Sequence, residues 1–327
     1  MRRRVNLQFR SVLAPPTSLI EQLAVSDPEN PFCTLEYATA CESLGGKVCF
    51  LGLCSGDQIV SGCTGVLSGS FLRRSLSIHS LPPLPTAEVF WSGLLQLCRA
   101  LKVWYLEVDT FASPSANIPQ LSGELARKRR WEYILDIEGD NFFAGVRRTH
   151  RGNIKRAIKA GLSVRRTREE AACAEHMKLI GASMERRAGR GEEVAVNQSS
   201  ARPMALLDSG LGELFQALDG NKILSSMLIL RSTRGAYWQS AGTRPEGMQI
   251  GASPFLLSRV ATTVKEEGAR VFNLGGASED NPGLRDFKSG FGTREVALQA
   301  ASFCPRSGLE REIHAVLRTG WSWMRRR

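Results

Sequence analysis

A glycine-rich segment near the C-terminal end of this 327-residue chain combines a cation with two aromatic side chains. Residues 283–292 read Gly-Leu-Arg-Asp-Phe-Lys-Ser-Gly-Phe-Gly, and they follow a strand-like stretch that ends in two glycines. Loops at the ends of strands are where α/β proteins usually build their sites. The segment is therefore a candidate site around Lys288. The alternative is that Phe287 and Phe291 belong to the hydrophobic core and that Lys288 faces solvent.

A second candidate lies where an expected strand runs into an expected helix. The stretch 242–252 contains Gly247 and Gly251 directly before a helix predicted at 253–267. Free amides at the start of a helix bind anions, and glycine lets a phosphate approach the backbone. Ordinary loops have the same composition, so the pattern allows a phosphate site without requiring one.

Basic residues recur along one side of an expected helix that ends near residue 160. Arg147, Arg151, Lys155 and Lys159 follow one another at intervals of four, and further arginines at 148 and 156 broaden this stripe. Acidic partners at i+4 would neutralise the stripe, and the sequence has none there. The stripe is therefore either a solvated face or a contact surface for phosphate or nucleic acid.

The elements that must carry these residues follow from the hydrophobic pattern. In the first 125 residues the pattern predicts helices at 17–25, 34–43 and 87–101, and strands at 48–53, 57–66, 76–79 and 103–108. Further along it predicts strands at 131–137, 162–166, 222–230, 236–242, 270–274 and 295–302, with helices at 167–187 and 283–290. Residues 245–252 are expected to form a loop.

The basic helix is expected to start at a cap supplied by Asp140 or Asn141. Its apolar face would consist of four side chains that recur at helical spacing, namely Phe143, Val146, Ile154 and Ile158. Near the C-terminus, Ser307 and Glu310 have the spacing of a capping box for a last helix.

Charge divides the chain into two parts. The formal net charge is +11, but residues 1–125 hold 9 Lys and Arg against 10 Asp and Glu, whereas residues 126–327 hold 34 against 22. This asymmetry predicts a domain boundary near residue 125, with 121–123 as a linker. The basic half predicts an anionic partner.

Several classes of protein are not expected. No stretch approaches about 18–20 uninterrupted apolar residues, so no transmembrane helix is predicted. The basic start at residues 2–4 lacks a following apolar region, so a cytoplasmic location is expected. Eight cysteines without a C-x-x-C pair, and four histidines without zinc-ligand spacing, predict buried free thiols and no metal site.

Three stretches together resemble the Fem-type aminoacyltransferases and their relatives in the GNAT acyltransferase superfamily. The first is the basic helix 147–161, which is similar to the pattern R-x-N-I-[RK]-[RK]-A-x-K-x-G of that family. The second is the hairpin, loop and helix from 222 to 267. The third joins Val-Phe-Asn-Leu-Gly-Gly at 271–276 to the later Phe-Lys-x-Gly-Phe-Gly.

The resemblance implies an α/β (α+β) fold of tandem GNAT-like domains, each a mixed, mostly antiparallel sheet flanked by helices. The expected domains are a degenerate N-terminal GNAT-like domain at 1–125 and a catalytic GNAT/Fem-like domain at 126–305. A basic C-terminal helix at 306–327 would follow, and it could make peripheral membrane contact. Such enzymes transfer an acyl group directly to an amine, without a covalent enzyme intermediate, and no tightly bound cofactor is implied.

The resemblance also implies roles for residues. Lys288 would stabilise developing negative charge or the leaving group of the donor, and Phe287 would shape the donor pocket. The remaining expectations concern donor binding by Arg285, Gln249, Gly251, Ala252 and Arg294, contact with tRNA or phosphate by Arg147, Arg151, Lys155 and Lys159, and an acceptor pocket formed by Tyr237, Trp238 and Asn273.

The donor and the acceptor stay open at this point. The first hypothesis is transfer from aminoacyl-tRNA to a cell-wall precursor or a small peptide-like amine. The second is transfer from acyl-CoA to an amino sugar, polysaccharide precursor or small amine, although residues 244–249 match only the front of the usual CoA loop, Q/R-x-x-G-x-G/A. The third is a non-catalytic protein that binds RNA or a membrane surface.

Overall fold

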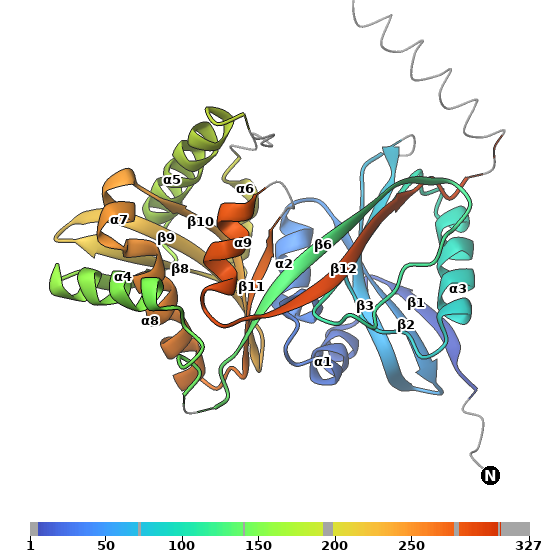
Figure 1. Ribbon diagram of the computed structural model, residues 1–327. Helices are drawn as coiled ribbons and strands as arrows, with labels where there is room; N and C mark the ends of the chain where they lie inside the picture. The colour runs from blue at the N-terminus through green and yellow to red at the C-terminus, as the bar shows by residue number, and fades with distance from the viewer. Residues whose placement is uncertain are drawn as a thin grey trace, which may run out of the picture. The chain divides into compact units, whose positions relative to one another are not determined.

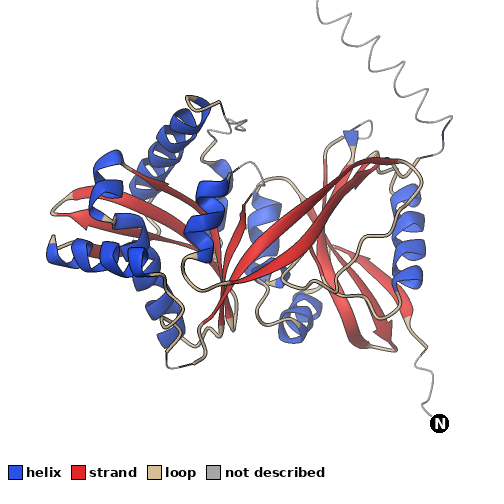
Figure 2. Ribbon diagram, viewed as in Figure 1, coloured by secondary structure: helices blue, strands red, loops and turns tan. Residues whose placement is uncertain are grey.

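The computed structural model describes residues 6–70, 73–139, 141–191, 199–277, 281–306 and 308. Their contacts form two compact units (Figures 1 and 2). Unit 1 takes its described residues from Met1–Pro16, Gly45–Arg129 and Leu298–Arg327, and unit 2 from Thr17–Leu44 and Arg130–Ala297. The domain ranges 1–125 and 126–305 remain a prediction, because each unit takes segments from both.

Unit 1 is a mixed sheet with strand order β1-β2-β3-β4-β5-β12. Its strands are β1 (Gln8–Leu13), β2 (Lys47–Ser55), β3 (Gln58–Ser68), β4 (Ser75–Leu81), β5 (Tyr105–Thr110) and β12 (Arg294–Phe303). Only β4 and β5 pair in parallel. A parallel pair needs a crossover connection, and helix α3 (Ala87–Ala100) supplies it, with Phe90 and Leu94 fully buried in the core of this unit.

Unit 2 repeats this plan with strand order β7-β8-β9-β10-β11-β6. Its strands are β6 (Glu124–Asp136), β7 (Ser163–Thr167), β8 (Gly212–Asp219), β9 (Lys222–Arg231), β10 (Gly235–Thr243) and β11 (Val271–Ala277). Only β10 and β11 are parallel, and α7 (Pro245–Ile250) and α8 (Ala252–Glu266) connect them. The predicted fold class, a mixed and mostly antiparallel sheet flanked by helices, is confirmed (Figure 2).

Helices cover both faces of the unit 2 sheet. On one face, α8 buries Leu256, Leu257 and Val260 completely in the core, and α4 (Arg148–Lys159) and α9 (Pro282–Ser289) belong to the same side (Figure 1). The helices on the other face form a series in which each contacts at least one other member. They are α1 (Thr17–Ser26), the 3-10 helix η1 (Pro31–Cys33), α2 (Leu35–Ser43), α5 (Glu170–Ala188) and α6 (Ala201–Asp208).

The start of the basic helix was predicted wrongly. Helix α4 begins at Arg148 after Arg147, whereas Asn141 and Phe143 lie in preceding turns. The Arg147 amide donates to the carbonyl of Gly290 (2.8 Å) and not to a carbonyl four residues earlier in the sequence, so the helix does not extend in front of Arg147. The other candidate cap, Asp140, lies outside the described residues.

The predicted apolar face of this helix is also wrong in part. The buried residues of α4 are His150 and Ala157, while Ile158 is 58% exposed. Val146 is buried but precedes the helix. The inward side of α4 is therefore narrower and more polar than the sequence pattern indicated.

Four elements of the described chain escaped the sequence pattern, among them the 3-10 helix η1, and one segment was assigned wrongly. Residues 245–250 form helix α7 and not a loop, with Pro245 at its first position, where a missing N–H is tolerated. Strand β8 is buried on both faces and so lacks the alternation that marks a half-buried strand. Strand β1 and helix α6 were also missed.

Two remaining predictions concern cysteines and the C-terminal helix. All eight cysteines are free, and all but Cys41 are buried, which confirms the prediction of buried thiols. Burial raises the pKa of Cys49 and of Cys98 to about 12. The predicted helix at 306–327 and its capping box lie outside the described residues, apart from 306 and 308.

Candidate functional site

The two parallel strands of unit 2 separate after a short paired region. Pairing between β10 and β11 covers Gly235–Tyr237 and Val271–Asn273. Beyond it, the pairing of β10 with β9 shifts between Trp238 and Ser240, and the pairing of β11 with β6 shifts between Asn273 and Gly276. The two strands are therefore not paired with each other beyond Tyr237 and Asn273, and we call the space between them the β10–β11 gap.

Lys288 reaches into this gap from α9. Its Nζ donates to the carbonyl of Gly276 on β11 (2.6 Å) and lies 4.9 Å from the centroid of the Trp238 ring on β10. The residue is only 4% exposed, and burial lowers the pKa of Lys288 to about 7, an effect that the charge of Glu132 partly opposes. The alternative prediction of a solvated Lys288 is therefore wrong, whereas Phe291 is fully buried in the core, as that alternative expected.

A buried carboxylate supports the β11 side of the gap. Glu132 of β6 is fully buried and accepts from Arg130 (2.7 Å) and from the Nδ2 of Asn273 (2.8 Å). The Oδ1 of Asn273 in turn accepts from the amide of Gly275 (2.8 Å), which has a φ of +71°. Sequence reasoning placed Asn273 in an acceptor pocket, but here it fixes the turn whose next carbonyl binds Lys288. Sequence reasoning did not identify Glu132. The one indication in the sequence was a charged residue inside a strand that is otherwise largely apolar.

The two aromatic residues predicted for the acceptor pocket lie on opposite faces of β10. Trp238 packs against the core on the α8 side, whereas Tyr237 makes an edge-to-face contact with Phe32 of η1 (5.2 Å). Strand alternation explains the difference. Only Trp238 is brought together with Lys288.

Phe287 joins an aromatic cluster beside the gap. Its ring lies 6.1 Å from that of Trp238, 5.4 Å from that of Phe291 and 5.1 Å from the ring of His150 on α4. Sequence reasoning also missed His150. Its position shows only in the tertiary structure, where a Cβ at Gly290 would lie 2.5 Å from the Nε2 of His150.

The residues predicted to bind the donor near α7 form a closed turn. Gly251 (φ +81°) separates α7 from α8, and a Cβ at this position would lie 2.6 Å from the carbonyl oxygen of Asn153 on α4. Ala252 is fully buried. Gln249 is exposed, and its carbonyl accepts from Arg156 (2.9 Å).

The first turn of α7 already carries an anion of the protein itself. The Glu246 carboxylate has a lowered pKa, because its own backbone amide and the neighbouring Lys222 (3.1 Å) stabilise the charged form. The Glu246 carboxylate would therefore repel a second anion at the start of this helix.

The two weaker arginine candidates differ in their surroundings. Arg285 is half-buried, donates to the hydroxyl of Tyr133 (3.2 Å), pairs with Glu295 (3.4 Å) and lies over the ring of Trp131. Arg294 is exposed at the start of β12.

The cations of α4 fall into two groups. Arg147 pairs with Asp286 of α9 (2.5 Å). Arg151, Lys155, Lys159 and Arg148 are exposed and form no ion pair with any residue that the structure describes. We call these four residues the α4 cationic face.

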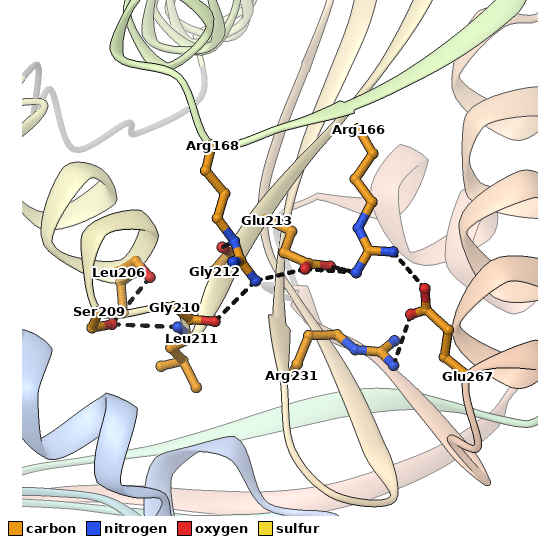
Figure 3. Close-up of polar contacts among 10 residues, drawn as sticks. All are labelled: Arg166, Arg168, Leu206, Ser209, Gly210, Leu211, Gly212, Glu213, Arg231 and Glu267. Atoms are coloured by element: carbon orange, nitrogen blue, oxygen red, sulfur yellow. Dashed lines mark hydrogen bonds and ion pairs between the residues drawn. The ribbon is translucent and has the colours of Figure 1, made fainter.

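Other arginines from the basic region 127–168 are neutralised (Figure 3). Glu213 of β8, almost fully buried, accepts from Arg166 (2.6 Å) and Arg168 (2.7 Å). Glu267 at the end of α8 pairs with Arg166 and with Arg231 (3.2 Å). This network joins β7, β8, β9 and α8, so these arginines stabilise the fold, whereas the α4 cationic face has no such carboxylate partners among the described residues.

Neither a metal centre nor a membrane-spanning helix is found in the described part of the chain. No group of three or more His, Cys, Asp or Glu side chains there could hold a metal ion. No described helix combines the length and apolarity needed to span a bilayer.

Comparisons with known proteins agree with this geometry. Residues 144–289 match the family model described as an acetyltransferase (GNAT) domain. No curated protein matches the sequence. Among solved structures, the chain is similar to FemX, with 12% identity, a TM-score of 0.64, and coverage of 89% of this chain and 96% of that one.

Two further structures have similar folds. One is a tandem GNAT protein from the clavulanic acid biosynthesis pathway, with 13% identity, a TM-score of 0.56, and coverage of 93% and 100%. The other is the C-terminal domain of a putative lysylphosphatidylglycerol synthetase from Agrobacterium fabrum, with 14% identity, a TM-score of 0.54, and coverage of 92% and 95%. The resemblance to Fem-type and GNAT proteins is confirmed, and the GNAT domain supports an acyltransferase.

Proposed function

We propose that this acyltransferase, whose residues 144–289 match a GNAT domain, moves an aminoacyl group from aminoacyl-tRNA to the amine of a peptide-like acceptor. The observation that carries acyl transfer is the buried Lys288 in the β10–β11 gap. The observation that favours tRNA as the donor is the α4 cationic face.

The reaction needs little covalent help from the protein. The amine nitrogen attacks the carbonyl carbon of the aminoacyl ester, the C–O bond to the ribose breaks, and the proton of the amine ends on the ribose oxygen. Lys288 in its charged form donates a hydrogen bond to the oxyanion that develops on the carbonyl, in a site from which water is excluded. With a pKa of about 7, a share of Lys288 carries that charge at neutral pH.

The strand geometry supports the positioning of the two substrates. An acyl group between the separated strands can accept hydrogen bonds from backbone amides there. The rings of Trp238 and Phe287, whose centroids are 6.1 Å apart, provide an apolar wall beside it. Holding reactants in place supplies much of the acceleration in such transfers.

Two features favour tRNA over CoA. Phosphate backbones bind to uncompensated Lys and Arg side chains, and the four residues of the α4 cationic face lack acidic partners in the described chain. The start of α7, where a CoA-type loop would receive phosphates, holds the Glu246 carboxylate, and Gly251 packs against Asn153.

An acyl-CoA thioester is the alternative donor, because the matching family model describes acetyltransferases. For the acceptor, a cell-wall precursor is proposed from the Fem-type resemblance, and an amino sugar or small amine is the alternative. A cytoplasmic location also remains a proposal.

One assay distinguishes the donors. The purified protein is incubated with a set of amines and either a labelled aminoacyl-tRNA pool or labelled acyl-CoA, and amide products are measured. Transfer from tRNA that ribonuclease abolishes, and that Lys288→Met reduces by about 100-fold or more, supports the proposal. Transfer from acyl-CoA alone refutes the tRNA donor, and no transfer from either refutes the acyl-transfer proposal itself.

The tRNA surface has its own test. We replace the four residues of the α4 cationic face with glutamine, namely Arg148, Arg151, Lys155 and Lys159. The KM for tRNA should rise by about tenfold, and the slope of log KM against log salt concentration should fall by about 3. A matched control replaces four exposed cations of unit 1 with glutamine, namely Arg10, Lys47, Arg73 and Arg99. An equal effect of the control would show that only net charge matters and would contradict a specific role for α4.

A further inference from the structure

The last turn of α9, which carries Lys288, ends in carbonyls that require hydrogen-bond donors. The final carbonyls of any helix lack intrahelical partners. In α9, the carbonyls of Asp286, Lys288 and Ser289 accept from the amides of 290, 291 and 292, at 3.0–3.1 Å. The chain after α9 therefore satisfies three of them.

The other two carbonyls are satisfied by α4. The carbonyl of Gly290 accepts from the amide of Arg147 (2.8 Å), and the carbonyl of Phe287 accepts from the Nε2 of His150 (2.9 Å). Because a carbonyl only accepts, the proton of His150 must be on Nε2. The guanidinium of Arg147 adds an ion pair with Asp286.

These contacts hold the residues directly around Lys288. They engage positions 286, 287 and 290, which lie on both sides of it. The ring of His150 also packs on those of Phe287 and Phe291, at 5.1 and 4.6 Å, and its Nδ1 is buried without a hydrogen-bond partner in the described chain. The absence of a Cβ at Gly290 leaves the space that this ring needs.

We propose that His150 is a positioning residue: its bond to the Phe287 carbonyl, together with the contacts of Arg147, fixes α9 so that the Nζ of Lys288 stays in the β10–β11 gap. This inference rests on the proposed role of Lys288 in acyl transfer. His150 itself has no free donor for a substrate, because its single N–H is already used.

The consequence for Lys288 is a change in its surroundings. We call the contacts of His150 and Arg147 with the last turn of α9 the clamp. Without it, this turn can move away from β11, and the Nζ of Lys288 then contacts water in place of the Gly276 carbonyl and the Trp238 ring. The ionisable groups facing this corner from the packed elements are Glu132 and Arg130 on β6, Arg147 and His150 on α4, and Arg285 and Asp286 on α9. Substitution of His150 by a neutral residue leaves the charges of the others unchanged.

The test uses two variants of His150 that differ in one donor. His150→Phe keeps an aromatic ring but removes the N–H, whereas the amide nitrogen of His150→Gln can replace Nε2. In protein with 13C-labelled lysine, the Lys288 resonance is assigned by its loss in Lys288→Met, and its titration is followed by NMR. His79→Phe in unit 1 is the control for a general effect of losing a histidine.

The expected result is a selective change in Lys288. In His150→Phe the Lys288 titration should move up by about one pH unit or more as burial is lost, and kcat should fall by about tenfold with a smaller change in KM. His150→Gln should restore both, and His79→Phe should change neither. An unchanged titration in His150→Phe, or a failure of His150→Gln to restore it, would overturn the proposal.

The NMR readout separates this proposal from the proposed function. If no donor supports transfer but the titration shifts as expected, the clamp stands and the acyl-transfer assignment falls. If His150→Phe does not fold, His150→Leu, which also removes the N–H and changes no neighbouring charge, takes its place and should shift the titration in the same direction. No shift in that variant would count against the clamp.

Discussion

Replacing Lys288 with methionine should stabilise the protein at neutral pH although it removes the group proposed to act in catalysis. Burial lowers the pKa of Lys288 from its ordinary 10.5 to about 7. Each unit of difference between the folded and unfolded states corresponds to about 1.36 kcal/mol. The folded state is therefore disfavoured by about 5 kcal/mol once Lys288 is charged in both states.

The sign follows from proton binding. Between about pH 7 and 10.5 the unfolded chain holds a proton on this lysine that the folded chain has lost, so the free energy of unfolding rises with pH across this window. Below pH 7 the full penalty applies. Methionine has a similar length and no charge, and it loses only the hydrogen bond to Gly276, which contributes about 1 kcal/mol. The expected net gain of Lys288→Met at pH 6 is about 4 kcal/mol.

The assay is chemical denaturation of wild type and variant at pH 6, 8 and 10. The advantage of Lys288→Met should shrink as the pH rises and disappear near the ordinary pKa of lysine. Lys155→Met, on the exposed side of α4, is the control and should show no pH-dependent difference. A variant that is less stable than wild type at pH 6, or a difference that does not change with pH, would refute the burial argument.

Three further predictions concern the framework of unit 2 and are measured by denaturant unfolding. Glu213→Gln should destabilise the protein by about 1.5 kcal/mol, because the buried acceptor of Arg166 and Arg168 loses its charge. In contrast, Asp57→Asn, in an exposed pair at 3.8 Å, should change stability by less than about 0.5 kcal/mol. Equal effects would contradict the role of the buried network. Gly251→Ala should lower the free energy of unfolding by about 2 kcal/mol or more, through backbone strain and a clash with Asn153. The control Gly268→Ala, at a positive φ with open space around it, should lower it by only about 1 kcal/mol. A larger loss in the control would be inconsistent with the packing of Gly251 on α4. Burial lowers the pKa of His176 to about 4, so wild type should lose up to about 3 kcal/mol as the pH falls from 6.5 to 4, and a His176→Gln variant that retains this slope would assign it to another group.

The hydrophobic pattern alone does not show the duplicated architecture, which was expected only from the resemblance to tandem GNAT-like proteins. No internal repeat is visible along the chain, yet both units have four antiparallel strands, one parallel pair joined through helices and one closing antiparallel strand. The closing strand of unit 1 is β12, from the end of the described chain, and that of unit 2 is β6, from its middle. Strand pairing over such separations depends on tertiary contacts, which local hydrophobic patterns do not encode.

The two local misassignments have different physical origins. Helix α4 was predicted to start too early, because Phe143 and Val146 have helical spacing, but the Arg147 amide bonds to Gly290, which is distant in sequence. Segment 245–250 contains glycine and proline and resembles a loop, yet it forms α7 because Pro245 occupies a first helical position. Backbone partners that are distant in the chain decided the first case, and the position of proline within the helix decided the second.

The sequence by itself determined the type of chemistry. Residue order and composition placed Phe287 and Lys288 after a glycine-ended strand, placed the cations of α4 at intervals of four, and gave the resemblance to GNAT and Fem-type transferases. These are local patterns, and a short segment carries them completely.

Only the tertiary structure decided what these residues can do. It buried Lys288 between Trp238 and Gly276, which lowers its pKa, and it placed His150 of α4 under the last turn of α9. It also divided the basic residues into those neutralised by Glu213 and Glu267 and those left exposed on α4. Burial and charge pairing depend on groups brought together from distant parts of the chain, so no local pattern can specify them.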